Sequence, residues 1–294
     1  MTYLPYGKSA NGPWAVEITP SLAGWTYSGL RVANLADATV SFDTGEEEML
    51  VLPLSGSCTV AITPSASPPP ATHGPDAVTF ELAGRSSVFD GPSDFVYLPI
   101  GAHVTLRGDG RIALPSARAT RALEPRHVPA ADVAVEIRGA GQASRQVNNF
   151  CAPGAFECDK LMAVEVLTPG GNWSSYPPHK HDTPNPGEAV LEEIYYFEVA
   201  GRGLGYQRVY SSERGQIDTL AEVSSGDVVL VPYGYHGPSM AAPGYDLYYL
   251  NVLAGPAEQR SMAFCDDPGH AWIRSSWDSQ PIDPRLPFGR KEVS

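Results

Sequence analysis

Short apolar runs recur along the whole chain, and turn-forming residues separate them. The runs are rich in Val, Leu, Tyr and Phe, which are residue types enriched in β-strands. No segment sustains the 3.6-residue period of a long amphipathic helix. The clearest runs are Met49–Leu54, Phe95–Ile100, Leu161–Leu167, Glu193–Val199, Gln207–Tyr210, Val228–Val231 and Leu247–Leu253. The pattern therefore predicts an all-β protein built as a barrel or a sandwich.

One sequence pattern occurs twice, which indicates two copies of the same architecture. Residues 94–103 and 227–236 both read D-x-x-x-x-P-x-G-x-H, a strand that runs into a tight turn and delivers a histidine. A glutamate pair precedes a glycine upstream in each half: Glu47-Glu48 before Gly56, and Glu192-Glu193 before Gly201. From that glycine to the turn proline there are 43 residues in the first half and 31 in the second, and a Pro-rich insertion at residues 64–75 accounts for the excess. We predict an N-terminal barrel over residues 1–125 and a C-terminal barrel over residues 126–294, joined near residues 115–131.

Composition and charge narrow the possible partners. The 294 residues are 43% hydrophobic and 18% charged, an ordinary globular balance, and the formal net charge is −13. Because phosphate binding needs a basic surface, nucleic acid is not an expected partner. The N-terminus lacks a signal-peptide pattern, no apolar stretch is long enough to cross a membrane, and the four scattered cysteines fit free thiols. A cytoplasmic protein is expected.

The second half carries a set of metal-ligand residue types. His179 and His181 form an H-x-H pair, and side chains two apart on a strand point to the same face. A glutamate from the next strand and His236 from the later turn would complete a pocket of three histidines and one carboxylate. Such a set suits zinc, manganese or iron(II), and it leaves coordination positions open for substrate. A lone turn histidine is more often solvated, but the ordered combination of motifs predicts one divalent metal ion.

Which glutamate completes the set is open at this stage. Glu193 lies as far from its glycine as Glu48 does, and it shares a strand face with Tyr195 and Phe197. Glu192 would point to the opposite face, and Glu188 lies in the preceding loop. We therefore favour Glu193 as the ligand over Glu192.

The first half lacks an H-x-H pair. His103 occupies the repeat position alone, and His73 lies in the Pro-rich insertion. Since a metal needs several convergent ligands, the N-terminal barrel is predicted to be a metal-free scaffold, with His103 as a relic.

With these motifs in view, the chain resembles the 5-deoxy-glucuronate isomerases of bacterial inositol breakdown. It is similar, more distantly, to the ketol-isomerases that act on 5-keto-4-deoxyuronate. The resemblance spans nearly the whole chain and is carried by Arg138–Phe150, Tyr176–Asp182, Leu191–Tyr196, Gln207–Tyr210, Val231–His236 and Gly244–Pro256. It implies two tandem cupin (jelly-roll) barrels, a metal on His179, His181, Glu193 and His236, and a homo-oligomer that acts on a small sugar acid. After the turn histidine the family usually reads Pro-Val, whereas this chain reads Gly237-Pro-Ser, which leaves the local pocket shape open.

The resemblance implies conversion of 5-deoxy-D-glucuronate to 5-dehydro-2-deoxy-D-gluconate through an enediolate. The metal would hold the carbonyl and hydroxyl oxygens, and a general base would move the proton. The sequence leaves that base open among Glu192, Glu188, Tyr195 and Tyr248. For the substrate carboxylate we favour Arg208 over Lys180, because a guanidinium binds a carboxylate through two bonds.

Three further readings remain open at the level of sequence. Arg138 and Arg145 flank the stretch between the barrels and are compatible with a structural role. A cupin dioxygenase would use the same metal ligands, and a non-catalytic sugar-binding bicupin would share the fold.

Overall fold

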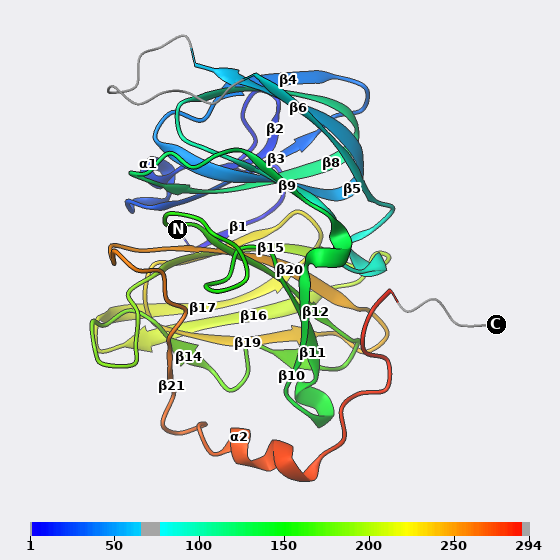
Figure 1. Ribbon diagram of the computed structural model, residues 1–294. Coiled ribbons are helices and arrows are strands. Elements are labelled where there is room, and N and C mark those ends of the chain that lie inside the picture. Colours follow the sequence, from blue (N-terminus) through cyan, green and yellow to red (C-terminus); the bar gives the residue numbers. More distant parts are fainter. Residues whose placement is uncertain (1, 66–76, 290–294) are drawn as a thin grey trace, which may run out of the picture.

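Strands dominate both halves of the computed structural model, which describes residues 2–65 and 77–289 (Figure 1). Each of the apolar runs predicted from the sequence lies wholly or largely within a strand. The first half holds β2 (Trp14–Ile18), β3 (Ser28–Asn34), β4 (Thr39–Asp43), β5 (Glu47–Pro64), β6 (Val78–Arg85), β7 (Phe95–Leu98), β8 (Ala102–Arg118) and β9 (Arg126–Val128). These strands form one eight-stranded sheet that curves around its own core. Residues 66–75 of the expected Pro-rich insertion lie outside the described residues.

The second half builds two sheets that face each other. The seven-stranded sheet has the order β1 (Tyr3–Leu4), β18 (Val228–Val231), β15 (Glu192–Val199), β20 (Leu247–Ala254), β12 (Met162–Thr168), β11 (Arg145–Asn149) and β10 (Ala134–Arg138). The six-stranded sheet contains β17 (Gly215–Val223), β16 (Gly205–Ser212), β19 (Tyr235–Ala241), β14 (His179–Lys180) and β21 (Cys265–Asp266), with β13 (Trp173–Ser174) paired to β19. Phe197, Val209 and Tyr249 belong to the apolar core of this half.

Strand pairing crosses the expected domain division at both ends. The strand β9, which follows residue 125, pairs with β7 in the N-terminal sheet. The first strand of the chain, β1, pairs with β18 in the C-terminal barrel. Each barrel therefore uses a strand from the sequence assigned to the other.

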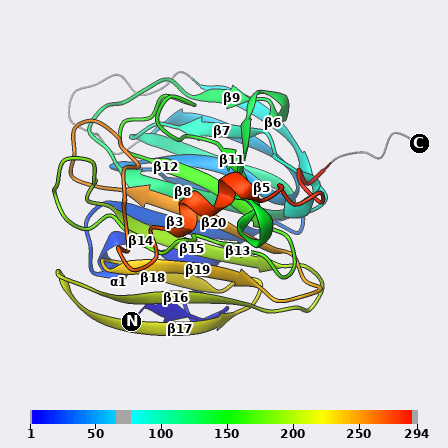
Figure 2. The same ribbon diagram turned by 90° about the horizontal axis from the view of Figure 1, so that it is seen from below.

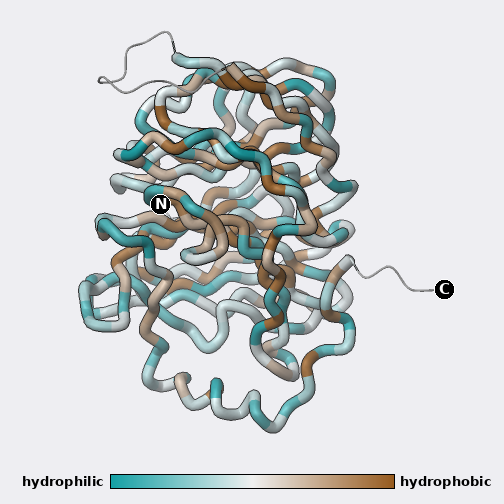
Figure 3. The backbone as a smooth tube through the Cα atoms, in the orientation of Figure 1, coloured by the Kyte–Doolittle hydropathy of each residue, from teal (hydrophilic) through white to brown (hydrophobic). Residues whose placement is uncertain are grey.

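The two barrels pack through a shared apolar layer. Leu30, Leu52 and Phe95 from the first barrel and Ile194 and Leu250 from the second belong to one buried cluster. Hydrophobic stretches are frequent where the barrels meet in Figure 3. The central strands of the second barrel are consequently buried on both sides. One side of these strands packs against the neighbouring barrel, and the opposite side packs against the interior of their own barrel.

The last described segment runs across the far end of the second barrel. It includes the short helix α2 (Ile273–Ser276) and crosses in front of the strands when the molecule is seen from below (Figure 2). Arg274 pairs with Asp266 of β21, and Asp283 accepts a hydrogen bond from Asn172, so both parts of the segment are tied to the barrel. The other helix, α1 (Pro20–Ala23), lies in the first half. Among the described residues, no helix is long and apolar enough to cross a membrane.

Candidate metal centre

The H-x-H pair lies on β14 and the residue after it, and its side chains alternate as the strand period requires. The rings of His179 and His181 are on one side, with their centroids 6.3 Å apart. Lys180 points to the other side, where its buried Nζ lies 3.0 Å from Asp182 and 2.9 Å from Glu188. The pair therefore presents two imidazoles to the barrel interior.

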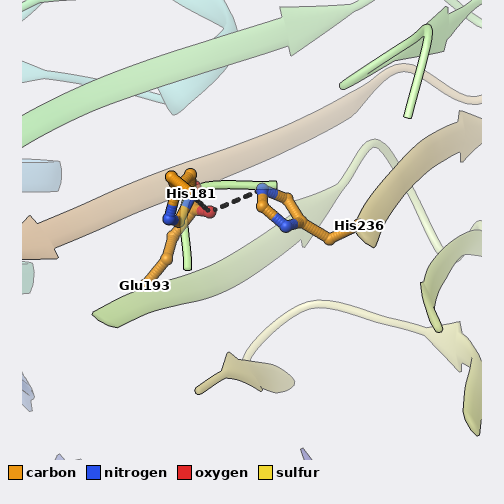
Figure 4. A group of neighbouring side chains, drawn as sticks. All are labelled: His181, Glu193 and His236. Atoms are coloured by element: carbon orange, nitrogen blue, oxygen red, sulfur yellow. Dashed lines mark hydrogen bonds and ion pairs between the residues drawn. The ribbon is translucent and has the colours of Figure 1, made fainter. Parts of the chain in front are cut away.

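Two further strands, β19 and β15, bring the remaining donors to these imidazoles. His236 lies on β19, directly opposite His179 of β14, and Glu193 lies on β15. The Oε2 atom of Glu193 is 2.9 Å from Nε2 of His181 and 3.0 Å from Nε2 of His236 (Figure 4). The three side chains are buried, and the ring of His179 lies 4.5 Å from that of His236 between centroids.

This geometry fits a bound divalent ion. Donor atoms about 2.1 Å from one ion, at about right angles, are themselves about 3 Å apart, which matches the spacing found here. Nε2 of His236 is buried, and apart from its contact with Glu193 it has no polar partner among the described residues. Buried polar atoms rarely remain unpaired, so this atom is available as a ligand. His181, Glu193 and His236 could hold a metal, with His179 beside them.

The electrostatics of the cluster favour charged glutamate. Burial raises the pKa of Glu193, but the charge of His236 and the hydrogen bond from His181 outweigh burial and hold this pKa well below its usual value. Burial, followed by the charges of His236 and His181, lowers the pKa of His179 well below its usual value. A carboxylate and a neutral imidazole are the protonation states that bind metal.

A cavity of about 500 Å³ opens beside the cluster. His179, His181 and Glu193 line one part of it. Its other polar side chains are Ser175, Tyr195, Tyr249, Asn251, Glu136, Arg138, Arg145 and Arg274, and the C-terminal segment contributes Trp277. The cavity is large enough for a small polar molecule to reach the cluster.

The Gly237-Pro-Ser departure has a local structural reason. The backbone of Gly237 passes so close to Ser175 that a Cβ at position 237 would lie 1.8 Å from the Ser175 carbonyl oxygen. Gly237 also adopts a φ of 99°, in the region that favours glycine. Ser175 in turn hydrogen-bonds Tyr195 and Tyr249 through its hydroxyl, at 3.0 and 3.1 Å. Glycine at 237 therefore lets the turn after His236 pack against this wall of the cavity.

Two residues predicted as catalytic lie at the joint between the barrels instead. The Glu192 carboxylate accepts hydrogen bonds from the backbone N–H groups of Thr26, Tyr27 and Ser28 at 2.7, 2.7 and 2.9 Å. The Tyr248 hydroxyl donates to Glu165 at 2.7 Å, beside Arg85 of the first barrel. Both point away from the cavity, which corrects the prediction. Among the predicted catalytic residues, Tyr195 lines the cavity.

The two residues predicted to bind the substrate carboxylate also lie elsewhere. Arg208 shares a face of β16 with Tyr206 and Tyr210, as expected, but this is the outer face, and its guanidinium pairs with Asp218. The inner face of β16 carries Gln207 and Val209. Lys180 is fully engaged with Asp182 and Glu188 outside the cavity lining. Glu188 is thereby also removed from the candidate bases.

The structure also corrects the repeat alignment that pointed to Glu193. Glu193 pairs with Val231 and Met49 pairs with Leu98, and Val231 and Leu98 each precede the turn proline. Met49 therefore occupies the position of Glu193. The number of residues between each glutamate and the following glycine was a misleading guide to the alignment. Gly56 lies inside β5, whereas Gly201 lies beyond the end of β15.

Glu48 is accordingly the counterpart of Glu192. Its buried carboxylate accepts hydrogen bonds from the backbone N–H groups of Asp159 and Leu161 of the second barrel, at 2.9 and 2.7 Å. Each barrel thus extends one glutamate to the backbone of the other.

The corresponding region of the first barrel is apolar. Met49 is fully buried in the barrel core, and the partly exposed His103 pairs with Asp43 at 3.0 Å. Within residues 2–65 and 77–289, the cluster of the second barrel is the one group of three convergent metal-ligand residues.

Several cavity residues were not predicted to act there: Ser175, Tyr249, Asn251, Arg145 and Arg274. Tyr249 follows the predicted Tyr248 on β20, and consecutive side chains of a strand point to opposite faces. Tyr249 therefore faces the cavity, and Tyr248 faces the first barrel. Arg145 belongs to the Arg138–Phe150 motif, which was a usable signal.

Comparison with known proteins identifies close relatives. A model of the KduI/IolB family matches residues 3–273. The 5-deoxy-glucuronate isomerase of Geobacillus kaustophilus is 41% identical over 268 residues, covering 89% of this chain and 91% of the relative. That of Bacillus subtilis strain 168 is 38% identical over 264 residues, covering 87% and 91%.

Solved structures agree with the architecture. The crystal structure of an IolB-like protein from Salmonella typhimurium LT2 has a TM-score of 0.81 at 34% identity, covering 93% of this chain and 99% of that one. Lactobacillus farciminis oxalate decarboxylase has a TM-score of 0.60 at 10% identity, covering 90% and 88%, so only its fold is shared. The predicted fold of two tandem cupin barrels is confirmed.

Proposed function

This chain belongs to the KduI/IolB family, and we propose that it is an isomerase that converts 5-deoxy-D-glucuronate to 5-dehydro-2-deoxy-D-gluconate in inositol breakdown. The observation that carries the proposal is the likeness to curated 5-deoxy-glucuronate isomerases over about nine-tenths of the chain. The buried cluster of His181, Glu193 and His236 beside a cavity supports it independently. The proposal includes a homo-oligomeric enzyme in the cytoplasm.

The proposed cofactor is one divalent ion held by His179, His181, Glu193 and His236, with the first barrel as a metal-free scaffold. Three imidazoles and a carboxylate suit zinc or manganese, and iron is also compatible with this set. When bound, the ion supplies Lewis-acid chemistry that polarises a substrate carbonyl.

The protein residues then bind and orient the sugar. Burial is the main cause that raises the pKa of Tyr195 well above its usual value, and the negative charge of Glu193 is the second cause. The hydroxyl of Tyr195 therefore keeps its proton. In this state Tyr195 is a hydrogen-bond donor for a substrate oxygen. The Ser175 hydroxyl joins Tyr195 to Tyr249 at 3.0 and 3.1 Å, which gives a short path for moving a proton between oxygens on this wall.

The test combines metal analysis with an anaerobic turnover assay. Wild-type protein should contain about one divalent ion per chain and should convert 5-deoxy-glucuronate, followed by NMR, without consuming oxygen. The variant His236→Ala should lose most of the metal and the turnover, because the remaining donors cannot close the shell. His103→Ala changes the repeat-equivalent histidine of the first barrel and should retain both.

Two results would contradict the proposal. Isomerase activity that survives in fully metal-free protein would remove the metal from the reaction. Oxygen-dependent cleavage of the sugar, in place of isomerisation, would indicate a cupin dioxygenase.

A further inference from the structure

Arg145 places a guanidinium in the cavity wall without a carboxylate partner. Only 8% of the residue is exposed, and its Nη1 donates to the backbone carbonyl of Ala143 at 3.0 Å. Across the described part of the chain, no ion pair involves this side chain. Burial, the largest influence, lowers its pKa to about 10, which reflects the cost of an uncompensated buried charge. An anion that enters the cavity would offset this cost.

The two other arginines of the cavity are already paired. Arg138 lies 2.8 Å from Glu136, its neighbour but one on β10. Arg274 contacts both carboxylate oxygens of Asp266, one of them at 2.8 Å. Among the described residues, Arg145 therefore differs from both in having no carboxylate partner.

The surroundings hold the Arg145 guanidinium in place. Its Cζ lies 5.4 Å from the centre of the Trp277 ring, which the C-terminal segment supplies. Gly139 also leaves room for it: a Cβ at that position would lie 2.6 Å from Nη1 of Arg145. A cation–π contact with an aromatic ring and a close backbone approach restrict the position of the guanidinium, which favours bidentate carboxylate binding.

One continuous wall connects Arg145 with the metal cluster. In the seven-stranded sheet, β20 and β12 lie between β15, which carries Glu193, and β11, which carries Arg145. Asn251 and Tyr249 of β20 line this wall. Burial raises the pKa of Tyr249, while Arg145 lowers it and Glu193 raises it, so the Tyr249 hydroxyl lies within the fields of both charges.

We propose that Arg145 binds the carboxylate of the substrate, while the carbonyl end of the sugar lies at His181, Glu193 and His236. A six-carbon sugar acid carries its aldehyde and its carboxylate at opposite ends, which matches a cavity with a cation on one wall and a metal cluster on another. The proposal rests on the proposed function for the identity of the sugar. It replaces Arg208 and Lys180 as the carboxylate-binding residue and explains how a protein of net charge −13 can take an anionic substrate.

The experiment compares two sugars on two enzymes. The first sugar is 5-deoxy-D-glucuronate, and the second is 5-deoxy-D-glucose, which replaces the carboxylate by CH2OH. In Arg145→Met, kcat/KM for the acid should fall about 10- to 100-fold, the usual effect of losing hydrogen bonds between charged groups. The value for the neutral sugar should change by less than about 3-fold, because it never engages the guanidinium.

Three controls accompany the comparison. The variant Arg208→Met removes an exposed arginine outside the cavity and should behave as wild type. Metal content and melting temperature report whether Arg145→Met is intact. If that variant does not fold, Arg145→Lys keeps the charge but not the fork, and it should show a smaller loss that is still confined to the acid.

A binding measurement separates this proposal from the proposed function. Calorimetry with the equilibrium mixture of the acid and its ketone gives a Kd that does not depend on turnover, and Arg145→Met should weaken it about 10-fold or more. Equal affinity in wild type and Arg145→Met, or an equal fall in kcat/KM for the acid and the neutral sugar, would overturn the role of Arg145. Failure of the wild type to isomerise the acid would instead overturn the proposed function, while the Kd comparison still decides the role of Arg145.

Discussion

The most discriminating change outside the cavity is Glu192→Gln, because Glu192 is either a catalytic base or a connection between the barrels. Its carboxylate accepts three backbone N–H groups of the first barrel at 2.7 to 2.9 Å and lies outside the cavity lining. Glutamine has the same shape, but it loses the charge and turns an NH2 group toward one of these donors. We therefore expect lower stability with intact catalysis.

The magnitude follows from the contacts. A hydrogen bond to a charged group contributes about 1.5–3 kcal/mol, and glutamine retains part of the acceptor capacity, so the loss should be about 2 kcal/mol. At about 2 °C per kcal/mol for a chain of this size, the melting temperature should fall by about 4 °C. Glu48→Gln is the matched variant on the other barrel. Because Glu48 is fully buried, its loss should be larger, about 3 kcal/mol.

The assay pairs scanning calorimetry with steady-state kinetics at a temperature well below the transition. Both glutamine variants should keep kcat within about 3-fold of wild type and bind the same amount of metal. A kcat lowered by about 100-fold or more in Glu192→Gln, with an unchanged melting temperature, would refute the reasoning and return Glu192 to the reaction.

Three further predictions concern residues around the site. Arg208→Met should leave kcat/KM for the acid unchanged, because this side chain lies on the outer face of β16; steady-state kinetics check it, and a large loss would place it in substrate binding. His103→Ala should leave turnover unchanged and at most lower stability, since the histidine is partly exposed and pairs with Asp43 at 3.0 Å; calorimetry and kinetics separate the two effects. Asp182 should make stability depend on acid pH. Burial raises its pKa, but bonds from Ser212, Gly234 and Lys180 outweigh burial and lower it to about 2, so its contribution is present above 3.8 and is lost as the pH falls toward 2. Acid unfolding of Asp182→Asn should lack this component, and an unchanged pH profile would contradict it.

Strand period and motif order were enough to predict the architecture and the convergence of His181, Glu193 and His236. Apolar runs bounded by turns predict the β-strands, and the duplicated turn pattern predicts two barrels. His179 and His181 share a face because side chains alternate along any strand, whatever the strand packs against. These features depend on local geometry, so they can be read from the sequence without knowing which side is inside.

The tertiary structure decided which of two buried faces each side chain occupies. Tyr248 and Tyr249 are both fully buried, because β20 lies between the cavity on one side and the first barrel on the other. Along such a strand no alternation of polar and apolar residues marks the inner face. The sequence therefore suggested Tyr248 as the tyrosine of the site, whereas in the structure Tyr249 lines the cavity. The same ambiguity placed Glu192 among the catalytic candidates, although its partners belong to the other barrel.

Arg145 and Arg208 show the same limit for charge. The sequence presents two arginines on strands, and nothing in their neighbours distinguishes them. Only packing shows that Asp218 neutralises Arg208 on the outer face while Trp277 covers Arg145 inside. Asp218 lies ten residues from Arg208, but Trp277 lies more than a hundred residues from Arg145, and folding alone brings such distant segments together. The sequence therefore determined the strands, the two barrels and the residues of the His181, Glu193 and His236 cluster, whereas long-range packing decided which arginine faces the cavity.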